Sequence, residues 1–501
     1  MTAKTLMIQG TGSSVGKSIL VAALCRIFKQ DGLKVAPYKS QNMSLNSFVT
    51  KDGGEMGRAQ VVQAEAAGVE PSVDMNPILL KPEADARSQV VVLGKPAKTL
   101  PASSYYLYTP ELLSIAEESL NRLRANYDLI IIEGAGSPAE INLKAREIVN
   151  MRIAKMANAP VLLVGDIDKG GVFASLVGTI ALLDDDERNY IKGFIINKFR
   201  GDVSLLTPGL DQLEEMTSLP VIGVVPYYHD IFIDEEDSVR CQPQSTSADI
   251  DIAVIHFSRI SNSTDFEPLQ QENNVTVRYV KRLEELGNPD VIILPGSKST
   301  ISDMTQMRET GLAEIIVQKA KQGTPILGIC GGFQMLGNRI NDPAHTESSK
   351  DSATGLGLLD VVTTFDPDKT TWQARATGFA QHGIFSGLDN KEITGYEIHM
   401  GQTLGEHVTP AFKILQRGPQ LTDHLDGAVD KNGTVVGTYL HGLFDNALVR
   451  QTFLSYLGTR KGLNILHTPT HSISKEEHYN KLADHVRQNL KMDLIRDICG
   501  L

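Results

Sequence analysis

Residues 5–18 read TLMIQGTGSSVGKS, an apolar run that leads into a glycine-rich turn and closes on Gly-Lys-Ser. A strand, a turn of this kind and a helix present backbone N–H groups and the positive end of a helix dipole to anionic oxygens. In this pattern Lys17 neutralises the β- and γ-phosphates of a nucleotide, and the Ser18 hydroxyl binds Mg²⁺. The common spacing has a glycine five residues before the Gly-Lys pair, where this chain has Thr11. The stretch therefore predicts a phosphate loop of variant spacing.

Short β-branched and apolar runs alternate with helical patterns along the first half of the chain. Predicted strands occupy residues 4–9, 34–38, 128–134, 159–166, 191–197 and 220–226. Near-continuous apolar strands separated by helices predict an α/β fold, with a parallel sheet covered by helices on both faces. Right-handed crossovers then bring the carboxyl ends of the strands, and the loops that leave them, to one edge of the sheet.

A polar stretch interrupts this alternation and predicts a linker at 236–250. A second α/β unit follows, with strands expected at 251–257, 275–280, 290–296 and 325–330, and the chain then becomes helical. We therefore expect domains at 1–235 and 251–450 and a C-terminal helical extension at 451–501. Within the extension, Ser474 and Glu477 predict a capping box at the start of a helix.

Composition excludes several classes of function. The formal net charge is −12, from 48 Lys and Arg against 60 Asp and Glu, which argues against a general nucleic-acid binder because such proteins rely on surplus positive charge. No apolar run reaches about 18 residues, so no membrane span is expected, and the N-terminus lacks the pattern of a signal peptide. The cysteines are far apart and form no CxxC pair, which fits a reducing cytoplasm; they are Cys25, Cys241, Cys330 and Cys499.

The stretch PILGICGGFQML places Cys330 between two glycines, after an apolar strand and before a helical run. This is the strand–turn–helix elbow that exposes a nucleophile, with cysteine in place of serine. The backbone N–H of Gly331 and a second donor, Gly296 in the loop PGSKS, are predicted to stabilise an oxyanion. A thiol nucleophile needs a base, and His441 at the end of a later β-rich run is the candidate.

The first half resembles the dethiobiotin synthetase group, whose members activate carboxylates or amines with ATP. The resemblance is carried by the loop GTGSSVGKS and by the segments DLIIIEGAGSPAE and INKF. It implies an adenine contact from Asn197 and a Mg²⁺ site formed by Ser18 and Glu133. It also implies an ATP site formed by Thr11, Gly12, Ser13, Val15, Gly16, Lys17 and Ser18.

The elbow and the stretch GTVVGTYLHGLFDN resemble the class I glutamine amidotransferase domain. In that family a cysteine and a histidine free ammonia from glutamine through a thioester. The usual pattern has a glutamate two residues after the histidine, where this chain has Leu443. The departure matches a branch that lacks this third member. Because this position holds Leu443, Glu397 and His399 remain as candidates to orient His441. Asp445 lies too far along the chain to take the place of the usual glutamate.

Long stretches over nearly the whole chain resemble the cobyric acid synthase family, among them 38–60, 76–95, 141–151, 165–179 and 395–403. The resemblance implies a cytoplasmic ligase of cobalamin biosynthesis with ATP, Mg²⁺, glutamine and a corrinoid. It would amidate the b, d, e and g carboxylates of adenosylcobyrinic acid a,c-diamide through acyl phosphates. Glu147 departs from the aspartate that is usual in the family. The candidate substrate contacts are Lys39, Gln41, Asn42, Asn46 and Lys81.

Three other interpretations share these features. Cobyrinic acid a,c-diamide synthase has the same two domains but amidates two other carboxylates, and the stretches NMSLNS and LLKPEADARSQVV favour the first interpretation over it. A ParA-like partition ATPase shares the fold of the phosphate loop, but it has no use for Cys330 and His441. A glutaminase with a regulatory ATP domain would consume no ATP for each amide formed.

Overall fold

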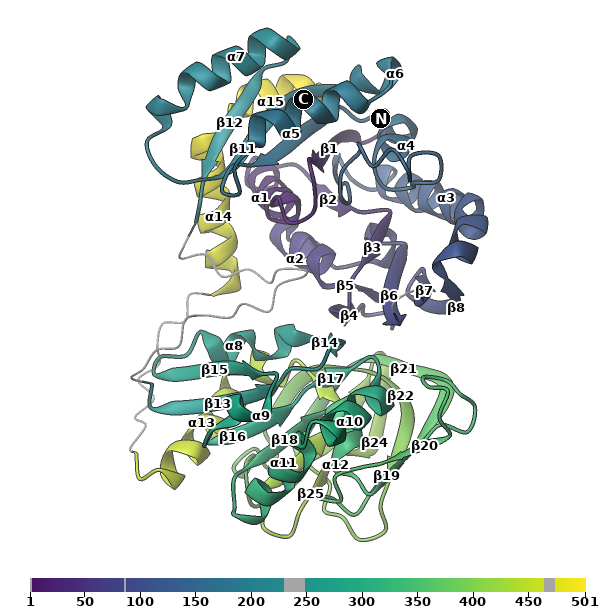
Figure 1. Ribbon diagram of the computed structural model, residues 1–501, viewed down its shortest axis with the longest axis vertical. Coiled ribbons are helices and arrows are strands. Elements are labelled where there is room, and N and C mark those ends of the chain that lie inside the picture. The colour runs from purple at the N-terminus through teal and green to yellow at the C-terminus, as the bar shows by residue number, and fades with distance from the viewer. Residues whose placement is uncertain (1, 85–86, 229–247, 464–473) are drawn as a thin grey trace.

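The computed structural model describes residues 2–84, 87–228, 248–463 and 474–501. Most of the predicted linker 236–250, including Cys241, lies outside these ranges. The described chain forms two α/β units stacked along the long axis of the molecule (Figure 1). The sequence prediction of an α/β fold with parallel sheets and C-terminal helices is confirmed.

The first unit is built on a six-stranded sheet in the order β12-β11-β10-β1-β9-β2, in which every neighbouring pair is parallel. Successive side chains of a strand point to opposite faces, so Leu6 and Ile8 of β1 pack in one core and Met7 in the other. The strands are β1 (Lys4–Gly10), β2 (Val35–Tyr38), β9 (Leu129–Glu133), β10 (Val161–Asp166), β11 (Ile191–Phe199) and β12 (Val221–Pro226).

Helices cover both faces of this sheet (Figure 1). The phosphate loop joins β1, which lies inside the sheet, to the largely buried α1. The helices of this unit are α1 (Lys17–Gln30), α2 (Arg58–Ala67), α3 (Ala102–Arg124), α4 (Met151–Ala157), α5 (Val172–Leu182), α6 (Asp185–Arg188) and α7 (Thr207–Thr217). None of the helices in the described residues is long and apolar enough to cross a bilayer.

The C-terminal helices divide between the two units (Figure 1). Helix α13 (Ala447–Arg460) packs in the core of the second unit, whereas α14 (Lys475–Asn489) and α15 (Met492–Cys499) return to the first and share a core with α1. Ser474 caps α14, because its Oγ accepts a hydrogen bond from the backbone N–H of Glu477 at 3.2 Å. The helical run breaks where Leu490 bridges to Gly223 of β12. A side chain at Gly223 would overlap the backbone of α14, so this close approach requires glycine.

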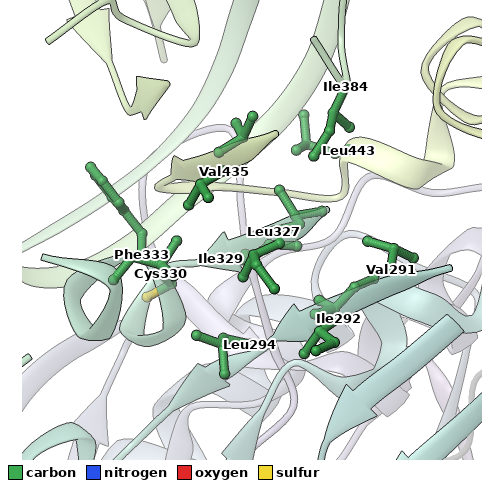
Figure 2. Packing of buried hydrophobic residues seen from close by; sticks show 14 of the residues in the cluster. Val291, Ile292, Leu294, Leu327, Ile329, Cys330, Phe333, Ile384, Val435 and Leu443 are labelled. Carbon is green, nitrogen blue, oxygen red and sulfur yellow. The ribbon is translucent and has the colours of Figure 1, made fainter. Parts of the chain in front are cut away.

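The second unit holds a sheet in the order β15-β13-β16-β18-β26-β25, parallel except for the last pair. Figure 2 shows Cys330 at the end of β18, beside Phe333 and near Leu294 of β16, where this sheet meets the start of α12. The strands are β13 (Ile250–Ile255), β15 (Val275–Val280), β16 (Val291–Leu294), β18 (Ile326–Ile329), β25 (Ala428–Val429) and β26 (Val435–Thr438). The helices include α8 (Glu267–Gln270), α9 (Leu283–Leu286), α10 (Thr300–Glu309), α11 (Leu312–Lys321) and α12 (Gly331–Leu336).

Long antiparallel strands, which the sequence did not predict, form a further layer of the second unit. The pair β21 (Val362–Gly378) and β22 (Glu392–Leu404) carries most of this sheet. Its other members are β19 (Arg339–Asn341), β20 (Ser352–Thr354), β23 (Phe412–Arg417), β24 (Gln420–Asp426) and β27 (Leu440–His441). Through β27, the layer carries His441 beside Tyr396.

Small sheets of the first unit face the second unit (Figure 1). They contain β3 (Gln41–Met43), β6 (Ile78–Ala84), β7 (Arg87–Val92) and β8 (Lys95–Pro101), and separately the pair β4 (Ser47–Val49) and β5 (Glu55–Gly57). The two units meet here, since Thr371 donates to the carbonyl of Gly53 at 2.8 Å and Gln373 to that of Val49 at 3.0 Å.

Candidate active site

The phosphate loop forms one wall of a cavity of about 1050 Å³. Lys17 Nζ donates to the carbonyl of Gly12 at 2.8 Å and to that of Gly136 at 3.2 Å, so the ammonium group joins this loop to the loop after β9. Among the residues predicted to bind ATP, those lining the cavity are Ser13, Gly16, Lys17 and Ser18. Of the others, Thr11 donates its backbone N–H to Val164 of β10, and Val15 is buried in the core.

Glu133, at the carboxyl end of β9, is the buried carboxylate of this cavity. Its Oε1 accepts hydrogen bonds from Ser18 Oγ and Lys39 Nζ, both at 2.9 Å. Burial opposes ionisation of this carboxylate. Lys39, the amide of Gln63 and Lys17 outweigh burial and hold the pKa of the group below its ordinary value. The ionised carboxylate and the Ser18 hydroxyl together offer the oxygen donors that Mg²⁺ prefers.

Asn197 holds the phosphate loop from the end of β11. Its side chain is buried, and Nδ2 donates to the carbonyl of Val15 at 2.9 Å. A side chain at Gly16 would overlap this amide, and the φ of Gly16 is 99°. Glycine is therefore required there by both the backbone and the packing. The adenine contact assigned to Asn197 stays a prediction beside this observed role.

Four of the five predicted substrate contacts line the cavity: Lys39, Gln41, Asn42 and Asn46. Each already has a protein partner. Gln41 accepts from the hydroxyl of Tyr105, and Asn42 donates to Gln60 at 3.0 Å. Asn46 Oδ1 accepts from the backbone N–H of a residue in the second unit, Ser263, at 3.0 Å. The wall is therefore an ordered polar surface.

The expectation that Lys81 contacts substrate does not fit the structure. Lys81 lies outside the lining of the cavity, and its side chain is only 3% exposed. Its Nζ pairs with Glu55 at 2.6 Å, and Lys369 of β21 pairs with the same carboxylate at 2.5 Å. Burial opposes ionisation of Glu55, but the two ammonium groups outweigh it and hold the pKa of this carboxyl well below its usual range. Lys81 thus belongs to an ion cluster that joins the two units.

Glu147, where the family usually has aspartate, caps the start of α4. Its carboxylate accepts backbone N–H bonds from Val149 at 2.7 Å, Asn150 at 2.6 Å and Arg152 at 2.9 Å. The N–H of Arg152 lies in the first turn of α4, and those of Val149 and Asn150 lie directly before the helix. A carboxylate at this end of a helix is favourable because it binds free N–H groups and faces the positive end of the helix dipole. The longer side chain therefore performs a capping role at the edge of the cavity.

Cys330 sits on a strained turn between β18 and α12. Its backbone angles, φ 53° and ψ −111°, are rare for a residue with a side chain and are typical of functional turns. The thiol is 8% exposed and donates to the carbonyl of Ile398 at 3.4 Å. The other described cysteines, Cys25 and Cys499, are buried away from this turn, and burial raises the pKa of each thiol. Cys330 is therefore the cysteine that the fold presents at a loop edge.

His441 is completely buried and is oriented by Asp265, a residue that sequence reasoning missed. His441 Nδ1 lies 2.6 Å from Asp265 Oδ2, and the other carboxylate oxygen accepts from the backbone N–H of Gly442 at 2.9 Å. Burial disfavours the charged ring, but Asp265 and then Cys330 outweigh it and raise the pKa of His441 to about 10. His441 Nε2 makes no hydrogen bond to the described residues, so it is available to a reacting group.

Glu397 and His399 do not orient His441. In the antiparallel pair of β22 and β27, His441 lies opposite Tyr396, whose ring stacks on it at 5.4 Å. Residues an odd number of positions from Tyr396 point to the other face of the strand. There Glu397 pairs with Arg417 at 2.7 Å, and His399 stacks on Tyr439 at 3.8 Å. Asp265 follows the first strand of the second sheet, and the rule that loops after parallel strands gather at one edge is the signal that points to it.

The predicted oxyanion donors lie around the thiol. A β-carbon at Gly331 would stand 2.8 Å from the backbone nitrogen of Ser297, and one at Gly296 would stand 3.4 Å from His441 Cε1. The two glycines therefore bring the loop after β16, the elbow and the imidazole together. The assignment of their N–H groups to an oxyanion remains a prediction.

Comparison with known proteins agrees with this division into two units. The CobQ/CobB/MinD/ParA nucleotide binding domain matches residues 6–239, and the CobB/CobQ-like glutamine amidotransferase domain matches residues 251–449. A cobyric acid synthase of Dehalococcoides mccartyi is 57% identical over 98% of both chains. A cobyric acid synthase of Sorangium cellulosum is 53% identical over 100% of this chain and 99% of its own, and one of Streptococcus sanguinis is 52% identical over 99% and 98%.

Proposed function

The chain belongs to the cobyric acid synthase family and is a glutamine-dependent ligase, and we propose that it amidates the b, d, e and g carboxylates of adenosylcobyrinic acid a,c-diamide. Each amidation would consume one ATP and one glutamine and release ADP, phosphate and glutamate. One observation carries the proposal. The cavity that contains the phosphate loop is closed on one side by Ile260 and Ser263 of the amidotransferase unit. Ammonia made in one unit therefore has an acceptor in the other.

The first unit supplies the electrophile. A carboxylate is a poor electrophile, so transfer of the γ-phosphoryl group to it yields an acyl phosphate that ammonia attacks, with phosphate as the leaving group. Lys17 is placed to bind the β- and γ-phosphates, and the loop N–H groups bind the remaining oxygens. Ser18 and Glu133 would hold Mg²⁺, which supplies charge neutralisation for phosphoryl transfer when bound.

The second unit supplies the nitrogen. The Cys330 sulfur attacks the side-chain carbonyl of glutamine, His441 delivers a proton to the departing ammonia, and a thioester remains. Water then hydrolyses the thioester to glutamate and regenerates the thiol, with His441 again carrying the proton. Asp265 keeps the proton on Nδ1, so that Nε2 faces the reaction. The N–H groups of Gly296 and Gly331 stabilise the oxyanion of the tetrahedral intermediates.

The cavity wall suits a corrinoid in kind. Corrin rings carry an apolar macrocycle with carboxylates around its rim. Met43 and Leu143 line the cavity, although they are 54% and 39% exposed. A bound corrin ring would bury the exposed apolar surface of these two side chains. Lys39 and the amides of Asn42 and Asn46 lie on the same wall.

The test is product mass after incubation with ATP, Mg²⁺, glutamine and adenosylcobyrinic acid a,c-diamide. We expect the mass of the corrinoid to change by the amount that corresponds to replacement of four carboxyl OH groups by NH₂. When ATP is omitted, its mass should not change. Conversion of cobyrinic acid in place of the diamide would instead support an a,c-diamide synthase. ATP hydrolysis with no corrinoid amidated would contradict the proposal and favour a nucleotide-switched ATPase.

A further inference from the structure

One short segment of the second unit, residues 260–265, touches both active sites. Its first residues, β14 (Ile260–Ser261), pair with β17 (Gly296–Ser297), the strand that holds the predicted oxyanion glycine. Ile260 and Ser263 line the acceptor cavity. Asp265, two residues after Ser263, holds the imidazole of His441. The segment therefore reaches from the acceptor cavity to the histidine of the glutaminase site, through β14 and the start of η3 (Ser263–Phe266).

A reciprocal pair of asparagine contacts fastens this segment to the wall of the cavity. Asn46 Oδ1 accepts from the backbone N–H of Ser263 at 3.0 Å, and Asn262 Oδ1 accepts from the backbone N–H of Ser47 at 2.9 Å. Asn262 is 1% exposed and has φ 55°, a left-handed conformation that asparagine tolerates. Its carbonyl accepts from the backbone N–H of Asp265 at 3.0 Å. Movement at Asn46 or Ser47 therefore displaces the turn that carries Asp265.

A second link runs from the neighbouring residue Phe48, through Tyr396, to the face of the imidazole. Phe48 of β4 packs edge-on against Tyr396, with ring centroids 5.2 Å apart, and Tyr396 stacks on His441 at 5.4 Å. Residues 46–48 are thus linked to His441 by one polar route through residues 262–265 and one aromatic route through Tyr396. Buried networks of this kind change between discrete arrangements because close-packed interiors deform little.

We propose that the amides of Asn46 and Asn262 form an interdomain latch, through which occupancy of the corrinoid cavity sets the position of Asp265 and so controls glutamine hydrolysis. The inference rests on the proposed function of the cavity. A ligand that contacts the wall from Gln41 to Asn46 tightens the latch and completes the alignment of Asp265 with His441. Without the ligand the alignment is looser, and glutamine is spared. Asn262 is a positioning residue in this scheme, since it touches no substrate.

The test compares Asn262→Gly with Asn262→Asp. Glycine keeps the left-handed backbone and removes the oxygen that accepts from Ser47, whereas aspartate keeps an acceptor oxygen. Wild type and Asn262→Asp should release glutamate about ten-fold faster when ATP and the corrinoid are present, and Asn262→Gly should lose this stimulation, as expected for loss of one buried hydrogen bond. Amidation with added ammonium salt should be the same in all three proteins, because it does not use Asp265.

Stimulation that persists unchanged in Asn262→Gly, or that is absent in the wild type, would overturn the latch. A protein that never amidates the corrinoid, even with ammonium salt, would instead show that the proposed function is wrong. In that case the latch is tested separately, by the rate at which iodoacetamide alkylates Cys330. Cys330→Ser serves as the blank, because it lacks the thiol. The latch requires slower alkylation at neutral pH in Asn262→Gly than in Asn262→Asp, and equal rates would contradict it.

Discussion

The phosphate loop and the elbow around Cys330 each join a strand to a helix, and Gly12 in the first and Gly332 in the second serve different purposes. In the elbow around Cys330, a β-carbon at Gly332 would overlap the carbonyl of Leu294, so packing alone demands glycine. In the phosphate loop, no described atom lies within 4 Å of a β-carbon at Gly12. The space at Gly12 is therefore free for a ligand, while the space at Gly332 is already filled by protein.

This contrast shows how each site is organised. The site around Cys330 is built from protein contacts, because the strained turn at Cys330, the buried His441 and Asp265 are held by packing and hydrogen bonds. The phosphate loop instead surrounds an open cavity, where Lys17 and Glu133 are held by partners that a ligand can replace. The first site has its base held by a segment that also contacts the other unit, whereas the second is an open cavity large enough for a sizeable ligand.

The largest expected effect comes from Cys330→Ser. Glutamine-supported amidation should fall by about 10⁴-fold or more, as for loss of a catalytic nucleophile, while amidation with ammonium salt continues. The assay measures amide formation with each nitrogen source. Cys499→Ser is the matched control, since Cys499 is buried away from both sites. Loss of both activities in Cys330→Ser would contradict two separable sites.

Asp265→Asn should come next, with glutamine hydrolysis lowered by about 10³- to 10⁴-fold, because the amide stabilises the wrong tautomer of His441. Glutamate release in the presence of the corrinoid measures the loss. Glu397→Gln is the matched control, because Glu397 pairs with Arg417 on the other face of the strand. A larger loss in Glu397→Gln than in Asp265→Asn would return the orienting role to Glu397.

The same variant should change the pH dependence of Cys330 alkylation. Asp265 raises the pKa of His441 to about 10, so the imidazolium beside the thiol persists from low pH until that value. Without the carboxylate, burial drives the pKa of His441 toward or below its ordinary value of about 6.5. Between about pH 6.5 and about pH 10, alkylation of Cys330 should therefore be fast in the wild type and slow in Asp265→Asn. An unchanged profile would show that Asp265 does not control the charge of His441.

Lys17→Ala tests the open site. Amidation from glutamine and from ammonium salt should fall together by about 10²- to 10³-fold, the usual cost of removing one group that stabilises transition-state charge. Basal glutamine hydrolysis should remain, which distinguishes this change from those in the elbow. Lys192→Ala is the control, because Lys192 is exposed on β11. Amidation that survives in Lys17→Ala would contradict the assignment of the loop.

The smallest expected effects are those of replacing one glycine by alanine in each of the two turns. Gly332→Ala should destabilise the protein by about 1–3 kcal/mol or more, because overpacking forces the backbone to shift. Gly12→Ala should change stability by less than about 0.5 kcal/mol, as substitutions into open space do, and should instead weaken ATP binding. Urea denaturation and nucleotide titration measure the two quantities. Equal destabilisation by both variants would remove the distinction between the turns.

Much of this architecture could be predicted from sequence. Most strands of the two main sheets are apolar runs, and the strands that were predicted appear within a few residues of their expected positions, as for β9. Lys17, Glu133 and Cys330 could be placed because each ends a strand or begins the next helix, where topology brings loops to one edge. The placement of β21 and β22 could not be predicted, since a half-exposed strand such as VTTFDPDKTTWQARATG has no continuous apolar run.

The contacts between the units depend on long-range packing that spacing does not report. Lys81 was expected to contact substrate, but it pairs with Glu55 beside Lys369. Asn46 lines the cavity as expected and also accepts a hydrogen bond from the backbone of Ser263, which the sequence did not predict. Asp265 lies in a single short turn, η3 (Ser263–Phe266), which has no periodicity to mark it. Topology predicts that its loop lies at the edge where the sites form, and the distance of 2.6 Å from His441 identifies its partner.

The central claim is that the two sites act as one amidoligase, with nitrogen passing from the glutaminase unit to the shared cavity. The most direct measurement supplies glutamine labelled with heavy nitrogen in its side-chain amide, together with an excess of unlabelled ammonium salt at neutral pH. The mass of the amidated corrinoid then reports the source of each nitrogen. We predict that the new amides carry the heavy label despite the unlabelled excess. Amides labelled only in proportion to the bulk ammonium would contradict the claim.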